Sequence, residues 1–241
     1  MKCDDAKTRW IWRAGLLVLA AGALAGCGGG GSTNTTPTAG TLDGTVAIGA
    51  PLAGATVSAV CRSGTASATT DSNGHYSMSF VFDPPCGLTA VASTVSLQSV
   101  ALGSGTYNLT SLTQLVVQYL ASQLGLSTSA LLSGVSSNAA VQSALASSTA
   151  LTNAEKAVAA LVSSQYHVTL SSTAFVTTAF VPGQSSLDSD LDALRSAGAI
   201  TSSGAPATAL VDAVASAGAA AGGGSQGSPT GGTGGTGTST P

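Results

Sequence analysis

The sequence predicts an α+β protein in which a small antiparallel β-sandwich precedes an α-helical region. From about residue 41 to residue 109, hydrophobic residues alternate with polar ones, which is the period of strands with one buried face. From residue 110 to residue 218, hydrophobic residues recur every three or four positions, which is the period of helices that bury one stripe. Low-complexity segments rich in Gly, Ser and Thr flank these two regions.

Residues 1–26 are predicted to be an export signal peptide. Four cations lie in the first 13 residues, and the apolar run that follows ends at Ala25, short of the ~20 residues that span a bilayer. The run closes on Leu24-Ala25-Gly26-Cys27, which resembles the lipobox of bacterial lipoproteins. This resemblance implies that residues 1–26 are a lipoprotein signal peptide and that Cys27 becomes the acylated first residue of the mature chain. The alternatives are an ordinary signal peptide cleaved near Ala25 and an uncleaved membrane helix.

The segments at either end of the folded region are predicted to lack a core of their own. Residues 27–40 are expected to form a flexible tether, and residues 219–241 a disordered tail. After Cys27 the chain carries three cations and eight acids, a formal net charge of −5. This balance offers no basic track for nucleic acid and no polybasic attraction to anionic lipid. The expected membrane contact is therefore the acyl chains. By resemblance to lipoprotein sorting, Gly28 favours the outer membrane over the inner one.

Alternation is clearest in three stretches of the first region, which are predicted to be strands. They are residues 55–61, 76–82 and 88–92, with Asp83-Pro84-Pro85 expected to break the chain between the second and the third. Turn residues separate the strands, at Gly49-Ala50-Pro51 and at Asp71-Ser72-Asn73-Gly74.

Cys61 and Cys86 remain once Cys3 is assigned to the leader and Cys27 to the lipid. An even pair in an exported protein predicts a disulfide. A metal pair or a reactive thiol is the alternative, but no His or Cys stands at ligand spacing around them.

Three short motifs stand out in the first region. They are Gly44-Thr45-Val46, the segment 51–57 that reads Pro-Leu-Ala-Gly-Ala-Thr-Val, and the segment 69–76 around Asp71-Ser72-Asn73-Gly74. Together these motifs resemble the carboxypeptidase regulatory-like domain, and the resemblance covers roughly residues 41–92. It implies a transthyretin-like sandwich of seven strands and an accessory role without a catalytic centre.

The second region is predicted to form several Ala- and Ser-rich helices. A capping box at Ser111–Gln114 opens the first helix and Gly125 ends it, while a second box at Thr152–Glu155 opens another. The other expected helices cover residues 129–135, 138–147, 186–197 and 205–217. Residues 105–113 and 180–194 also resemble segments of exported bacterial lipoproteins, which implies architecture and location only.

Residues with catalytic or metal-binding chemistry are few. His75 is expected to be a solvated turn residue, and His167 to lie near a helix end. Asp188, Asp190 and Asp192 are spaced like the start of a calcium loop, but the Gly and Glu that an EF-hand requires are missing. These acids are therefore expected in exposed first turns of a helix. No cofactor is predicted, and no metal site.

These observations favour a non-catalytic, lipid-anchored cell-envelope protein that acts as a binding or structural module. Its expected partners are the membrane, through acyl chains on Cys27, and an envelope protein or glycan. Two alternatives remain: an accessory subunit or domain of an envelope hydrolase, and a carrier of a small apolar ligand between the Ala-rich helices.

Overall fold

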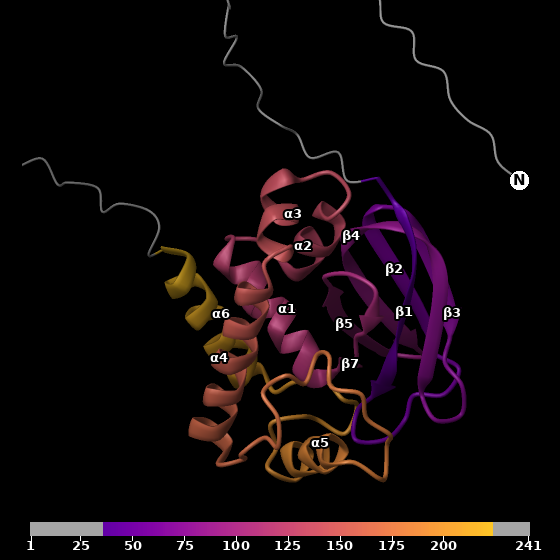
Figure 1. The fold of residues 1–241 in the computed structure, drawn as a ribbon. Coiled ribbons are helices and arrows are strands. Elements are labelled where there is room, and N and C mark those ends of the chain that lie inside the picture. Colours follow the sequence, from indigo (N-terminus) through magenta and orange to yellow (C-terminus); the bar gives the residue numbers. More distant parts are fainter. Residues whose placement is uncertain (1–35, 224–241) are drawn as a thin grey trace, which may run out of the picture. The chain divides into compact units, whose positions relative to one another are not determined.

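The computed structural model describes residues 36–223, in which strands and helices segregate along the chain as predicted for the α+β class (Figure 1). The strands are β1 (Thr38–Ala47), β2 (Thr56–Ser63), β3 (Thr65–Thr69), β4 (His75–Ala92), β5 (Val95–Ala101), β6 (Gly105–Thr106) and β7 (Leu109–Thr110). The helices are α1 (Ser111–Gln123), α2 (Thr128–Gly134), α3 (Ala139–Leu145), α4 (Ser148–Tyr166), α5 (Ser186–Ser196) and α6 (Thr208–Gly223).

Strand β4 joins the two halves of the sheet. Its first half pairs antiparallel with β1, from Thr45↔His75 to Thr38↔Phe82, and its second half pairs antiparallel with β2 and β5. The strand order is β3-β2-β4-β1-β6, with β7 also pairing with β1. The sheet is mixed rather than purely antiparallel as predicted, because the short strands β6 and β7 run parallel to β1.

The predicted break at residues 83–85 is wrong, since β4 runs without interruption for 18 residues. The Pro84–Pro85 peptide bond within it is cis. Proline interrupts a sheet because it lacks an N–H donor, so it is tolerated only where no ladder bond is needed. Here the ladder to β2 itself changes register, between Cys61↔Cys86 and Ser63↔Asp83, at the point where the prolines lie.

The predicted alternation of strand residues is confirmed. Val57 and Ala59 of β2 and Tyr76 and Met78 of β4 are buried, while their neighbours in sequence are exposed. Both faces of β5 are covered, because Leu97 and Val100 are each 1% exposed although they point to opposite faces.

The predicted disulfide between Cys61 and Cys86 is present. The two residues face each other across β2 and β4, and both are buried. Their separation of 25 residues corresponds to a stabilisation of about 3.5 kcal/mol in the chain-entropy account of disulfides.

Helix α1 connects the sheet to the helices. It follows β7 directly and packs against β5, α4 and α6. Its capping box is formed by Thr110 and Thr113, one residue before the predicted box at Ser111–Gln114. Gly125 follows the helix with a φ of +68°, as expected for the residue that ends it.

Three predicted boundaries differ from the structure. Helix α4 is capped by Ser147, so the predicted start at Thr152 falls inside it. Helix α6 continues to Gly223, beyond the predicted limit of residue 218. Strand β1 begins at Thr38, so the last three residues of the predicted tether are in the sheet. The leader, Cys27 and the rest of the tail lie outside the described residues.

Candidate functional site

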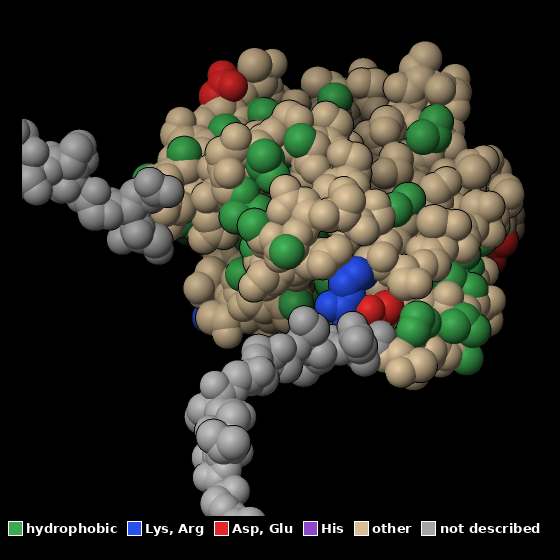
Figure 2. Space-filling model, turned by 90° about the horizontal axis from the view of Figure 1, so that it is seen from above, with side chains coloured by type: hydrophobic (Ala, Val, Ile, Leu, Met, Phe, Trp, Pro, Cys, Tyr) green, Lys and Arg blue, Asp and Glu red, His purple; other side chains and the backbone are tan. Residues whose placement is uncertain are grey.

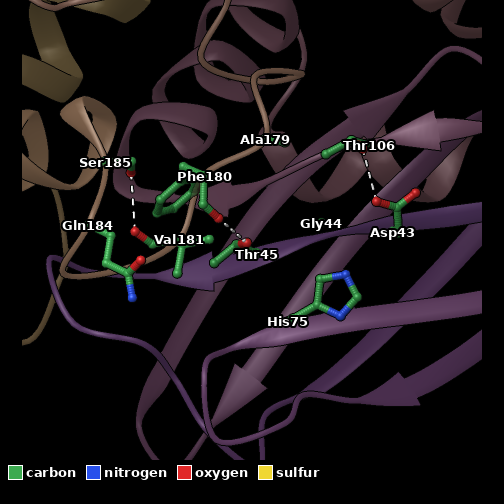
Figure 3. Close-up of a pocket in the computed structure, with 10 residues that line it drawn as sticks. All are labelled: Asp43, Gly44, Thr45, His75, Thr106, Ala179, Phe180, Val181, Gln184 and Ser185. Atoms are coloured by element: carbon green, nitrogen blue, oxygen red, sulfur yellow. Dashed lines mark hydrogen bonds between the residues drawn. The ribbon is translucent and has the colours of Figure 1, made fainter.

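Two open depressions adjoin on the outer face of the sheet, between strands β1, β4 and β6 and the loop that precedes α5 (Figure 3). Their volumes are about 450 and 250 Å³, and they share Thr45, His75, Phe180 and Val181. We call them together the His75 groove. The larger depression is also lined by Asp43, Gly44, Thr106, Ala179, Gln184 and Ser185, and the smaller one by Asp71, Asn73 and Pro182.

The floor of the groove is polar because alternate residues of three paired strands point to the same face. The register places His75 opposite Thr45, and Thr106 opposite Asp43. The Thr106 hydroxyl donates a 2.9 Å hydrogen bond to Oδ2 of Asp43, which fixes the orientation of the carboxylate. Figure 3 shows the Asp43 carboxylate turned toward Thr106, with the His75 imidazole projecting from the neighbouring strand.

The turn before β4 positions His75. Oδ1 of Asp71 accepts hydrogen bonds from the backbone amides of Asn73 (2.8 Å) and His75 (2.9 Å). Gly74 has a φ of +74°, and a Cβ there would lie 2.5 Å from the carbonyl oxygen of Val46. Glycine is therefore required by both conformation and space. The His75 side chain is exposed, and within residues 36–223 it makes no hydrogen bond.

Asn108 holds in place the loop before α5, which forms the wall of the groove. Its side-chain amide is fully buried and donates to the carbonyl oxygens of Phe175 (3.0 Å) and Thr178 (2.7 Å). Its Oδ1 accepts from the backbone amide of Thr45 at 3.2 Å, so one side chain ties β1 to the loop. The Thr45 hydroxyl adds a 3.0 Å bond to the carbonyl oxygen of Phe180. Asn108 was not predicted as a site residue, because its three partners lie 63 to 70 residues away along the chain.

Behind the floor, Tyr76 is buried and donates a 2.6 Å hydrogen bond to the carbonyl oxygen of Tyr107. Burial raises the pKa of the Tyr76 phenol far above its ordinary value, and the nearby charges of Asp43 and Tyr107 raise it further. The phenol therefore stays protonated and serves as a fixed donor. A Cβ at position 44 would overlap the same Tyr107 carbonyl group, which explains the glycine between Asp43 and Thr45.

The groove does not contain a paired nucleophile and base. Among the described residues, no hydrogen bond links the His75 imidazole to a serine or to Asp43, and the Ser185 hydroxyl donates instead to the carbonyl oxygen of Val181. Nor does any group of three or more His, Cys, Asp or Glu side chains within residues 36–223 have the geometry to hold a metal ion. The groove offers hydrogen-bonding groups and a small apolar wall.

The predicted acid cluster on α5 is arranged differently from the expectation. Asp192 is exposed, but Asp188 and Asp190 are only 6% and 8% exposed. Asp188 accepts from the backbone amide of Gly183 (2.8 Å), and Asp190 accepts from both the amide (2.8 Å) and the hydroxyl (2.6 Å) of Ser171. These carboxylates fix the loops around the groove wall rather than facing solvent.

Glu155 is another buried acid, and its predicted place in a capping box is wrong. It lies inside α4, is 5% exposed and accepts a 2.9 Å hydrogen bond from the backbone amide of Val176. Burial raises its pKa, and the bond from Val176 offsets part of that rise. His167 lies at the end of α4, as predicted, in the left-handed conformation with a φ of 57°.

Within residues 36–223 no single helix is long and apolar enough to cross a bilayer. The helices α1 and α2 together have the length and composition of a span, but the pair is bent by 83° at the break between them. Comparisons with known protein families, curated proteins and solved structures find no match to this chain.

Proposed function

We propose that this protein is a lipid-anchored cell-envelope protein that binds a ligand or partner and does not catalyse a reaction. The observation that carries the anchoring is the sequence Leu24-Ala25-Gly26-Cys27 at the end of a positively charged and then apolar leader. Two acyl signals give stable attachment where one is marginal, and lipidation of Cys27 supplies them. Gly28 favours the outer membrane.

Three structural observations support this proposal. Strand β1 starts at Thr38, so ten residues rich in Gly, Ser and Thr lie between Cys27 and the sheet along the sequence. The Cys61–Cys86 disulfide suits an exported protein, because oxidising compartments preserve such bonds. The His75 groove supports a binding role, since its polar groups converge without a paired nucleophile and base.

Fatty-acid labelling tests the anchor. The full chain is expressed in a two-membrane bacterium with an alkyne-tagged fatty acid, beside the variants Cys27→Ser and Cys3→Ser. We expect wild type and Cys3→Ser to carry the label in the membrane fraction, and Cys27→Ser to be an unlabelled precursor. The control matters because Cys3 lies within the leader but lacks the small residues that precede Cys27. An unlabelled wild type, or a labelled Cys27→Ser, contradicts the proposal.

Activity assays test the second half of the proposal. We expect no turnover of generic ester, peptide or glycoside substrates by the purified protein. One result contradicts the non-catalytic assignment. It is a turnover that is abolished in His75→Ala or Asp43→Asn and intact in Asp212→Asn.

A further inference from the structure

The two depressions of the His75 groove form one elongated site. They meet at His75 and Val181, so a ligand longer than a single ring reaches from Asp43 at one end to Asp71 and Asn73 at the other. A combined volume near 700 Å³ lies within the range of ~300–1,000 Å³ that small-molecule sites occupy.

The charges that line the groove restrict the kind of ligand that it can bind. Asp43 and Asp71 line the groove, whereas no Lys or Arg does. Two of the three cations in the described chain make interactions elsewhere, since Arg62 pairs with Asp83 and Arg195 donates to the carbonyl oxygen of Ile48. Figure 2 shows that charged side chains are also sparse on another face of the molecule. Phosphate, sulfate and carboxylate groups are therefore disfavoured in the groove by like charge.

The hydrogen-bonding groups favour a ligand with several hydroxyl groups. The Asp43 carboxylate accepts one bond from Thr106 and, as a group with about four lone-pair sites, retains capacity for ligand hydroxyls. His75, Gln184 and Asn73 each combine donor and acceptor capacity, and their side chains make no hydrogen bond within residues 36–223. Groups that both donate and accept match hydroxyls, which do the same.

The remaining wall is apolar. Val181 is 50% exposed at the middle of the groove, a large exposure for a valine, and it stands beside the buried ring of Phe180. A pyranose ring presents hydroxyls at its edge and C–H groups on its faces. A chain of such rings covers Val181 with a C–H face while its hydroxyls reach the strand residues.

From this arrangement we infer that the His75 groove binds a linear neutral oligosaccharide. The inference deepens the proposed binding function and rests on it. Asp43 is the main acceptor for ligand hydroxyls, and Val181 is the contact for a ring face.

Isothermal titration calorimetry on the full chain, purified in detergent from the membranes of cells that express it, tests the inference. The probes are the neutral tetramers of glucose in α-1,4 and β-1,4 linkage and of N-acetylglucosamine, with an amine-bearing glucosamine tetramer and an anionic galacturonate tetramer as comparisons. We expect at least one neutral tetramer to bind and the galacturonate not to bind. Tighter binding of the glucosamine tetramer than of every neutral one overturns the neutral class in favour of an ammonium ligand.

Three variants locate the binding. Asp43→Asn keeps an acceptor for Thr106 but removes the charge that strengthens hydroxyl bonds, so it should weaken binding roughly ten-fold or more. Val181→Ser should weaken it several-fold by removing the apolar contact. Asp212→Asn, exposed on α6, is the control and should bind as wild type does. The inference is overturned if both Asp43→Asn and Val181→Ser are folded by circular dichroism and bind as tightly as wild type. A chain labelled at Cys27 that binds none of the probes overturns this inference and leaves the anchoring proposal intact.

Discussion

At the scale of single residues, the buried carboxylates accept hydrogen bonds from backbone amides elsewhere along the chain. Glu155 reaches an amide 21 residues away, Asp190 one 19 residues away, and Asp188 one five residues away. Each partner is a backbone N–H group, which carries no sequence signature. The positions of these acids on helices were predictable, but their burial was not, because it depends on which loop returns to cover them.

Glu155 makes stability depend on pH. Its pKa is raised in the folded state, so between the ordinary carboxyl pKa and the raised value the folded protein holds a proton that the unfolded chain has released. Stability therefore falls as pH rises through that window and does not recover above it. In Glu155→Gln the neutral amide still accepts the Val176 bond, so the free energy of unfolding should exceed that of wild type by an amount that grows with pH across the window.

Urea unfolding at a series of pH values measures this difference. Asp212→Asn removes one negative charge from an exposed site and controls for the net charge of the protein. A constant difference between Glu155→Gln and wild type at every pH contradicts the prediction. Glu155→Ala lacks the acceptor and should be less stable than Glu155→Gln by about 1–3 kcal/mol.

At the scale of elements, local sequence patterns predicted where the helices lie more accurately than they predicted the residues at which the helices begin. Thr110-Ser111-Leu112-Thr113-Gln114 contains two overlapping capping patterns, and the end of β7 at Thr110 decides which is used. The strand β3 was not singled out, because Thr65–Thr69 has no large hydrophobic residue and lies at the sheet edge. The groove was not predictable either, since its wall is separated from its floor by more than 70 residues along the chain.

The contact between α1 and α6 requires a small residue. A Cβ at Gly218 would overlap the carbonyl oxygen of Tyr119 and lie 3.1 Å from Cβ of Ser122. Gly218→Ala should therefore lower the free energy of unfolding by roughly 1–3 kcal/mol, although alanine is the better helix former. Gly223→Ala, where nothing lies within 4 Å of the added atom, is the matched control and should change stability by less than about 0.5 kcal/mol. Equal melting temperatures for the two variants would falsify this account of the contact.

At the scale of the whole molecule, sheet and helices share one hydrophobic core. Leu97 and Val100 lie on opposite faces of β5, and both belong to this core. Helix α1 packs against β5 and follows directly after β7. The class and order of the elements were predictable from periodicity. That the two regions would fold together was not, because it depends on β5 being buried on both faces.

We therefore expect residues 36–109 not to fold when expressed without the helices. The fragment would expose Val100 and Leu109, both now buried. Circular dichroism should give a cooperative thermal transition for residues 36–223 and none for residues 36–109. A cooperative transition of the shorter fragment would identify the sheet as an independent domain.

The position of β1 also has a mechanical consequence. The segment that leads back to Cys27 enters the fold at Thr38, whereas the His75 groove begins at Asp43, further along the same strand. A pull between a ligand in the groove and the N-terminal side of the chain acts along the length of β1. The ladder bonds of β1 to β4 lie perpendicular to that direction, so they bear the load together in shear and not one after another as in a zipper. The strand that presents the groove is thus also the one suited to transmit tension.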